Sequence, residues 1–370
     1  MIRMYRRVAG VGLALTMLVA GCGHSSSTSQ GPATSSTPVP SVATSSTRAA
    51  SATSQAARDL PDPHTLRGLT EVPELPDPKP VEGSSAQKLP VTVTDVEGNK
   101  VTIKSTSRIL ALDLYGTLSR TLIGLGLGDK IVGRTVSSTE KQLHDRPVVT
   151  ENGHVLNVEA VAGLKPSVII ADRSVGPKEA LDQLRKSGIP VVLVDPHRSV
   201  GSTPQLIRTI ADAVGKPDAG EALVKRTQEQ IDQAKKQIAA WKPAKPMRVA
   251  FLYVRGNAGV FFILGSENGA SELIQGVGAD DVASDKGITT LVPANAESLV
   301  SINPDAIFVM RDGLASTGGM KGLLARAGVA NTTAGRKQRV ISIPDGISLS
   351  FGPQTGEVLT AVAKALYGVK

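Results

Sequence analysis

The chain has 370 residues, a net charge of +8 and 41% hydrophobic residues, which is enough for two globular domains with separate cores. Aromatic residues make up only 3% of the chain, and no basic run is interleaved with them. This composition argues against a nucleic-acid-binding protein.

The N-terminus has the pattern of an export signal. Three arginines precede the apolar run 8–20, which is too short to span a bilayer as a helix. Small residues stand directly before Cys22, the only cysteine of the chain. This pattern resembles a bacterial lipobox, which implies that residues 1–21 are removed and that Cys22 carries lipid. We therefore expect a protein anchored by lipid on the extracytoplasmic face of the cell membrane.

Residues 22–88 are rich in Ser, Thr, Pro, Ala and Gly and contain few large apolar residues. Such a segment buries too little surface to offset its chain entropy. The composition therefore predicts a disordered tether between the lipid and the folded part.

Alternating strand and helix patterns predict a parallel α/β lobe over residues 89–216. It starts with a hairpin at 91–94 and 101–103. The further strands and helices are expected at 109–112, 116–125, 130–133, 168–171, 177–187, 191–194 and 203–214.

A long helix is predicted over residues 217–243, because apolar residues recur there at steps of three and four. Asp218 and Glu221 have the spacing of a capping box, and Pro243 ends the pattern. No second helix follows closely enough to pair with it, so we expect it to connect two lobes.

Residues 156–170 and 294–308 repeat one pattern, with Asn, Glu and Pro at the same offsets. Each copy predicts an Asn-capped helix, a proline stop and a buried strand. The second copy lies in a second α/β lobe, 244–370. Its other elements are expected at 247–253, 260–264, 268–277, 319–327, 340–343 and 354–367.

Two α/β lobes joined by a single long backbone helix, in an exported lipoprotein, resemble the helical-backbone class of substrate-binding proteins. These proteins serve bacterial ABC importers of haem, siderophores and cobalamin. The resemblance covers residues 89–370 and implies a ligand cleft between the lobes, no enzymatic activity and a monomer. It also implies that Glu159 and Glu297 dock onto the membrane permease, which works with an ATPase. Each glutamate alone also fits an acid that stabilises a helix N-terminus by about 0.3–1 kcal/mol.

Two loops indicate the ligand, namely 150–154 before the first repeat helix and 253–256 after the first strand of the second lobe. They resemble the loops of HmuT-type haem-uptake lipoproteins of actinobacteria, which carry a histidine on one lobe and a tyrosine and arginine on the other. The resemblance implies that haem is clamped between His154 and Tyr253, one ligand for each axial position of the iron. Ferric iron favours a phenolate, and Arg255, on the same strand face as Tyr253, supplies a positive charge that favours ionisation.

Each of these residues also fits a simpler role. His154 alone is compatible with a helix cap or a solvated loop residue, Tyr253 with the core and Arg255 with the surface. His197 is a reserve ligand, and Met310 fits either the cleft or the core. Arginines at strand ends that are candidates for the haem propionates are Arg134, Arg173 and Arg311.

Three other functions remain as alternatives. A ferric-siderophore or cobalamin receptor has the same fold, although siderophore pockets use aromatics that are scarce here. A zinc or manganese receptor needs three or four converging ligands, and only His154 and His197 are suitably placed. An enzyme is disfavoured because the chain has no nucleophile elbow, metalloprotease helix, P-loop or dinucleotide fingerprint.

Overall fold

The structure is a computed structural model that describes residues 60–82, 87–256 and 259–370. The predicted signal peptide, Cys22 and the first part of the predicted tether lie outside these residues. Within the described ranges, no helix is both long enough and apolar enough to cross a membrane.

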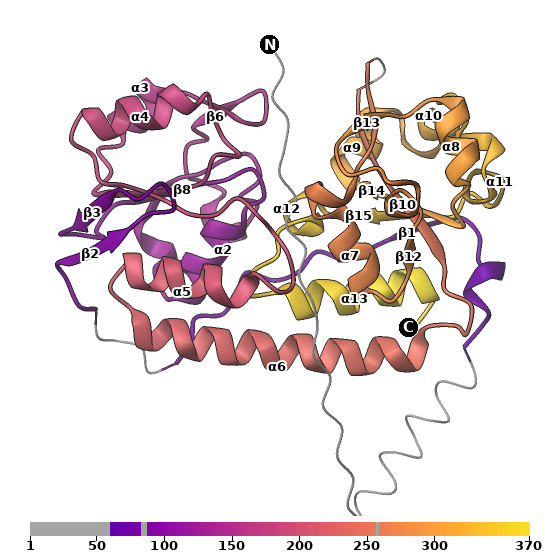
Figure 1. Cartoon of the computed structure of the whole chain (residues 1–370), viewed down its shortest axis with the longest axis horizontal. Helices are drawn as coiled ribbons and strands as arrows, with labels where there is room; N and C mark the ends of the chain where they lie inside the picture. Colours follow the sequence, from indigo (N-terminus) through magenta and orange to yellow (C-terminus); the bar gives the residue numbers. More distant parts are fainter. Residues whose placement is uncertain (1–59, 83–86, 257–258) are drawn as a thin grey trace, which may run out of the picture. The chain divides into compact units, whose positions relative to one another are not determined.

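The first lobe, in which Figure 1 labels β8, is built on a four-stranded parallel sheet. The order of its strands is β5-β4-β8-β9. Alternate residues of β4 belong to two different core clusters, so helices cover both faces of this sheet. Two antiparallel hairpins, β2-β3 and β6-β7, are attached to it. The elements are β2 (Val91–Thr94), β3 (Lys100–Ile103), β4 (Ile109–Leu112), α2 (Thr117–Gly124), β5 (Ile131–Gly133), β6 (Thr150–Glu151), β7 (Val155–Leu156), α3 (Val158–Gly163), β8 (Val168–Ala171), α4 (Lys178–Lys186), β9 (Val191–Leu193) and α5 (Thr203–Ala213).

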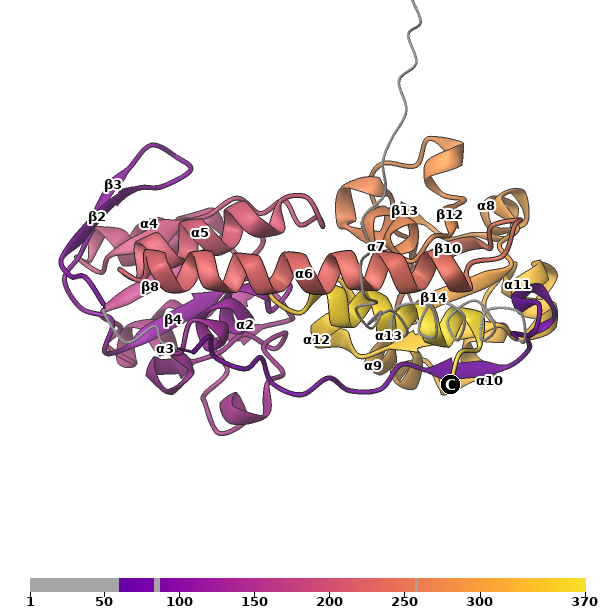
Figure 2. The same ribbon diagram turned by 90° about the horizontal axis from the view of Figure 1, so that it is seen from below.

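Helix α6 (Pro217–Trp241) connects the two lobes and packs against α5 and α13 (Thr355–Tyr367), as Figure 2 shows. Its buried Leu223 belongs to a core cluster of the first lobe and its buried Ile238 to one of the second lobe. The predicted capping box is wrong. The helix begins at Pro217, so its N-cap is Lys216 and not Asp218, and no side-chain cap forms because a lysine side chain has no hydrogen-bond acceptor.

The second lobe contains a sheet in the order β1-β15-β14-β10-β11-β13, with β12 paired to β10. Strands β1, β15, β14 and β10 are parallel, and β11 and β13 are antiparallel to their neighbours. The elements are β1 (Leu69–Glu71), β10 (Arg248–Arg255), β11 (Val260–Ile263), α7 (Ala270–Gly276), β12 (Asp280–Asp281), β13 (Val292–Pro293), α8 (Ala296–Ile302), β14 (Ala306–Met310), α9 (Arg311–Ser316), α10 (Gly319–Leu324), α11 (Thr333–Lys337), β15 (Val340–Ile343) and α12 (Asp345–Ser348).

The structure contradicts the predicted tether over residues 60–82. Strand β1 lies within this segment and pairs in parallel with β15, and the following Val72 is completely buried. From there the chain crosses to the first lobe, where the Asp77 carboxylate accepts hydrogen bonds from two backbone N–H groups at 2.8 and 2.9 Å. Low hydrophobicity did not prevent order, because backbone pairing with a sheet edge and a single buried valine hold the segment. The lobes are therefore connected by a second segment besides α6.

The two repeat copies share their local hydrogen bonds. Asn157 and Asn295 cap α3 and α8 through their side chains, as predicted. At the other end of each helix, Arg108 and Arg248 donate to two terminal carbonyl oxygens. An arginine at the start of an inner strand, directly before β4 in the first lobe and as the first residue of β10 in the second, thus satisfies helix carbonyls that would otherwise lack partners.

Candidate functional site

Tyr253 and Arg255 stand two residues apart near the end of β10, so both side chains lie on the same face of the sheet. The guanidinium carbon of Arg255 lies 5.0 Å from the centroid of the half-buried Tyr253 ring. This is a cation–π contact, worth roughly 0.5–1 kcal/mol at a partly exposed site. The structure therefore brings the two predicted residues together, with the Arg255 guanidinium over the face of the Tyr253 ring.

Arg255 is also held by an acidic residue. Its Nη2 donates to Oδ1 of Asp345 at 2.6 Å and approaches the sulfur of Met310 at 3.4 Å. Burial raises the pKa of Asp345, while a backbone hydrogen bond from Asp312 and the charge of Arg255 act in the opposite direction. The half-buried Met310 thus touches the candidate site through its sulfur.

His154 lies at the tip of the β6-β7 hairpin, where Asn152 and Gly153 adopt left-handed backbone conformations with φ of 48° and 89°. Its side chain is exposed, and its carbonyl oxygen accepts a hydrogen bond from the Gly176 N–H at 2.9 Å. The following helix is capped by Asn157. The helix-cap role considered for His154 is therefore excluded, and its imidazole is accessible to solvent.

The strand ends of the first lobe carry a buried ionic cluster that the sequence analysis missed. Arg198 makes an ion pair with Asp172 and lies 3.7 Å from Asp113, and all three side chains are almost completely buried. Burial, together with the charge of Asp172, raises the pKa of Asp113 to about 7. The sequence contained one signal of this cluster, because Asp113 and Asp172 each directly follow a buried strand that the sequence predicts.

This cluster also includes Tyr115, whose ring centroid lies 5.5 Å from the Arg198 guanidinium. Burial and the negative charge of Asp172 raise the pKa of the Tyr115 phenol. A phenol in such surroundings stays protonated, so Tyr115 is a poor candidate for a ligand of ferric iron.

Two of the three arginines considered for the haem propionates are already paired with carboxylates. Arg173 binds Glu97 and Asp182, and Arg311 binds Glu74. Arg134 donates through Nη1 to two carbonyl oxygens of its own loop, at 3.4 and 3.5 Å.

The remaining predicted residues are on the surface. His197 is exposed, as are Glu159 and Glu297 in the first turns of α3 and α8. Both glutamates are accessible to a partner while also lying at helix N-termini. Among the described residues, no group of three or more His, Cys, Asp or Glu side chains is arranged to hold a metal ion.

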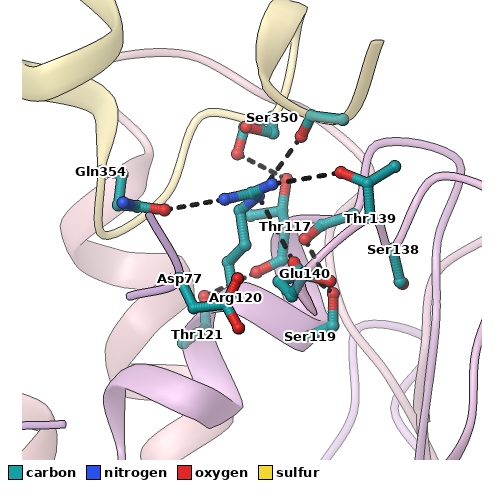
Figure 3. Close-up of polar contacts among 12 residues, drawn as sticks. Asp77, Thr117, Ser119, Arg120, Thr121, Ser138, Thr139, Glu140, Ser350 and Gln354 are labelled. Carbon is teal, nitrogen blue, oxygen red and sulfur yellow. Dashed lines mark hydrogen bonds and ion pairs between the residues drawn. The ribbon is translucent and has the colours of Figure 1, made fainter. Parts of the chain in front are cut away.

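The lobes meet in a buried polar contact next to the candidate site (Figure 3). Arg120 of α2 donates through Nη1 to Gln354 at 2.7 Å and through Nε to the Gly346 carbonyl oxygen at 3.2 Å, both in the second lobe. It also makes an ion pair with Glu140 at 3.4 Å, and burial raises the pKa of that carboxyl group. Thr117 adds a hydrogen bond to the Ser350 carbonyl oxygen at 2.7 Å. The loop that follows β15 is therefore fixed from the first lobe.

The family model described as "Periplasmic binding protein" matches residues 114–346, and the chain belongs to this family. It is thus a binding component of a transporter that acts outside the cytoplasm rather than an enzyme, as predicted. The crystal structure of the haem-binding protein HmuT is 49% identical and covers 84% of this chain and all of its own, with a TM-score of 0.82. This similarity confirms the predicted two-lobe α/β fold and the HmuT-type resemblance.

Two curated relatives extend the comparison. The uncharacterised ABC transporter substrate-binding lipoprotein YvrC of Bacillus subtilis is 27% identical over 280 residues, 75% of this chain and 86% of YvrC. A cobalamin-binding protein of Halobacterium salinarum is 24% identical over 299 residues, 79% of this chain and 78% of the relative.

Proposed function

We propose that this protein is the haem-binding lipoprotein of an ABC importer, which holds ferric haem between His154 and Tyr253 and delivers it to a membrane permease. The observation that carries the proposal is the Arg255–Tyr253 stack at the end of β10, in a chain 49% identical to haem-binding HmuT. Solved variants of HmuT replace a histidine, a tyrosine and an arginine, the three residue types proposed here.

The chemistry of the two ligands fits this role. A phenolate is a suitable ligand for ferric iron, and a nearby guanidinium favours the ionised phenol. The accessible imidazole of His154 would supply a nitrogen ligand for the other side of the haem iron.

The test is the absorption spectrum of the purified protein titrated with ferric haem. We expect saturable binding with a tyrosinate-to-iron charge-transfer band, which disappears in Tyr253→Phe. Saturable haem binding without that band, or a band unchanged in Tyr253→Phe, would contradict the tyrosine ligand. A protein that binds no haem would contradict the function itself.

Delivery would depend on the two exposed glutamates and on the lipid. Reversing Glu159 and Glu297 to Arg together should abolish haem-dependent growth while leaving the haem spectrum intact, because both lie on the outer surface. Loss of the spectrum in this double variant would speak against a docking role. Cys22→Ala should prevent labelling with a radioactive fatty acid, and normal labelling would remove the lipid anchor from the proposal.

Cobalamin is the second candidate ligand, because the Halobacterium relative is a cobalamin-binding protein. Titration of the haem-free protein with cobalamin separates the two. Tight cobalamin binding that Tyr253→Phe leaves unchanged would favour the alternative.

A further inference from the structure

Asp345 is the charged partner of Arg255 in the candidate site and lies at the start of α12, in the loop after β15. Both of its carboxylate oxygens are used. Oδ1 accepts from Arg255 at 2.6 Å, and Oδ2 accepts from the backbone N–H of Asp312 at 2.8 Å. The carboxylate therefore has a fixed orientation, with one oxygen aimed at the guanidinium.

Helix α9 lies close against one side of the guanidinium. A Cβ on Gly313 would lie 2.2 Å from Nη1 of Arg255 and 2.5 Å from the backbone carbonyl oxygen of Val254, and because that backbone atom cannot easily move, only glycine fits there. On its other sides Arg255 meets the Tyr253 ring and the Met310 sulfur. Asp345 thus adds a charged contact to a partly exposed guanidinium that lies over the tyrosine ring.

The turn that carries Asp345 is anchored from the other lobe. The next residue, Gly346, accepts a hydrogen bond from buried Arg120 through its carbonyl oxygen. A Cβ on Gly346 would lie 2.0 Å from Oγ1 of Thr139, also in the first lobe. Figure 3 shows Arg120 within its network of polar contacts. The position of Asp345 is therefore set by the contact between the lobes as well as by its own lobe.

We propose that Asp345 is a positioning residue of the haem site, which holds Arg255 against Tyr253 and so supports the phenolate ligand. This inference rests on the proposed function. Asp345 does not touch the iron and acts only through Arg255. Its anchoring by Gly346 and Arg120 links the strength of the tyrosine–iron bond to the contact between the lobes.

The experiment follows the tyrosinate charge-transfer band of the ferric haem complex during acidification. In Arg255→Ala, the midpoint, which is the pH at which half of the band is lost, should rise by about one unit, since the phenolate loses a neighbouring positive charge. Asp345→Ala should move it in the same direction and should add nothing in the Arg255→Ala background. Asp345→Asn keeps a neutral oxygen acceptor for Arg255, so its midpoint should stay near that of the unaltered protein.

Asp312→Asn is the matched control, because it removes an exposed carboxylate from the same neighbourhood and leaves the backbone N–H in place. Its midpoint should not change. If Asp345→Ala and Asp345→Asn both lose the band at a lower pH than the unaltered protein does, Asp345 only neutralises the charge of Arg255 and the inference is wrong. An unchanged midpoint in Asp345→Ala, with a shifted one in Arg255→Ala, also overturns it while the proposed function stands.

Absence of the band from the unaltered complex would overturn the tyrosine ligand and this inference together. If Asp345→Ala does not fold, Asp345→Ser takes its place, because serine is also too short to reach Arg255. Thermal unfolding of each haem-free variant establishes that it is folded before the titration.

Discussion

Each lobe has a tyrosine near the carboxyl end of an inner strand, with an arginine against its ring, yet the two pairs have different surroundings. Tyr115 follows β4, and Tyr253 lies in β10. The guanidinium lies 5.5 Å from the ring centroid for Arg198 and Tyr115, and 5.0 Å for Arg255 and Tyr253. The Arg198 side chain is only 2% exposed and faces two carboxylates, whereas that of Arg255 is 33% exposed and faces one.

This difference separates a structural pair from a candidate ligand pair. In the first lobe, burial and the negative charge of Asp172 raise the pKa of the Tyr115 phenol, which opposes metal binding. In the second lobe, the half-buried Tyr253 is reachable from solvent and has an arginine with a single acidic partner. The same two residue types therefore stabilise the fold in one lobe and are suited to ligand binding in the other.

The largest expected effect comes from removing the buried cation. Arg198→Met leaves Asp113 and Asp172 buried without their cation, which should lower the free energy of unfolding by about 3–5 kcal/mol. Arg255→Met should cost less than about 1 kcal/mol, because its ion pair is partly exposed to solvent. Urea denaturation of both haem-free variants measures this. An equal decrease in the free energy of unfolding in both variants would show that the two arginines have the same role.

Haem binding should depend on Tyr253 and not on Tyr115. Tyr253→Phe should weaken ferric haem binding by roughly a hundredfold, or about 2.7 kcal/mol, because it removes the oxygen that binds iron. Tyr115→Phe is the matched change in the first lobe and should leave the affinity unaltered. Spectroscopic titration measures both. A stronger effect of Tyr115→Phe would place the iron ligand in the first lobe.

The histidine should contribute less than the tyrosine in the ferric state. His154→Ala should weaken haem binding by about tenfold, near 1.4 kcal/mol, and should keep the tyrosinate band, because the anionic ligand remains. His144→Ala is the control, since His144 is also exposed and its ring contacts the carbonyl oxygen of Thr139 instead. Equal affinities of the two variants would remove His154 from the site.

The smallest effect concerns pH and the buried cluster. Because the pKa of Asp113 is raised to about 7, the folded state keeps a proton that the unfolded chain loses above about pH 4. This proton stabilises the fold at low pH, and its contribution falls as the pH rises from about 4 to about 7. Asp113→Asn should therefore raise Tm at pH 8 by a few degrees more than at pH 4.5. Calorimetry measures Tm at both pH values. A larger rise in Tm at pH 4.5 than at pH 8 would contradict the raised pKa of Asp113.

The sequence alone determined the features that repeat over a few residues. The apolar spacing of α6, the Asn caps of α3 and α8, and the two-residue step from Tyr253 to Arg255 are all local patterns. Each follows from the geometry of a helix or strand, so it could be predicted without knowing the neighbours.

Tertiary structure alone decided which distant groups meet. Strand β1 is ordered because it pairs with β15, about 270 positions away, although its own composition predicts a coil. Asp345 reaches Arg255 across 90 positions, and Arg198 joins Asp113 and Asp172 from a separate loop. These pairings depend on the order of strands in the sheets, which local spacing does not encode. They determine which tyrosine is buried in an ionic network and which remains open to a ligand.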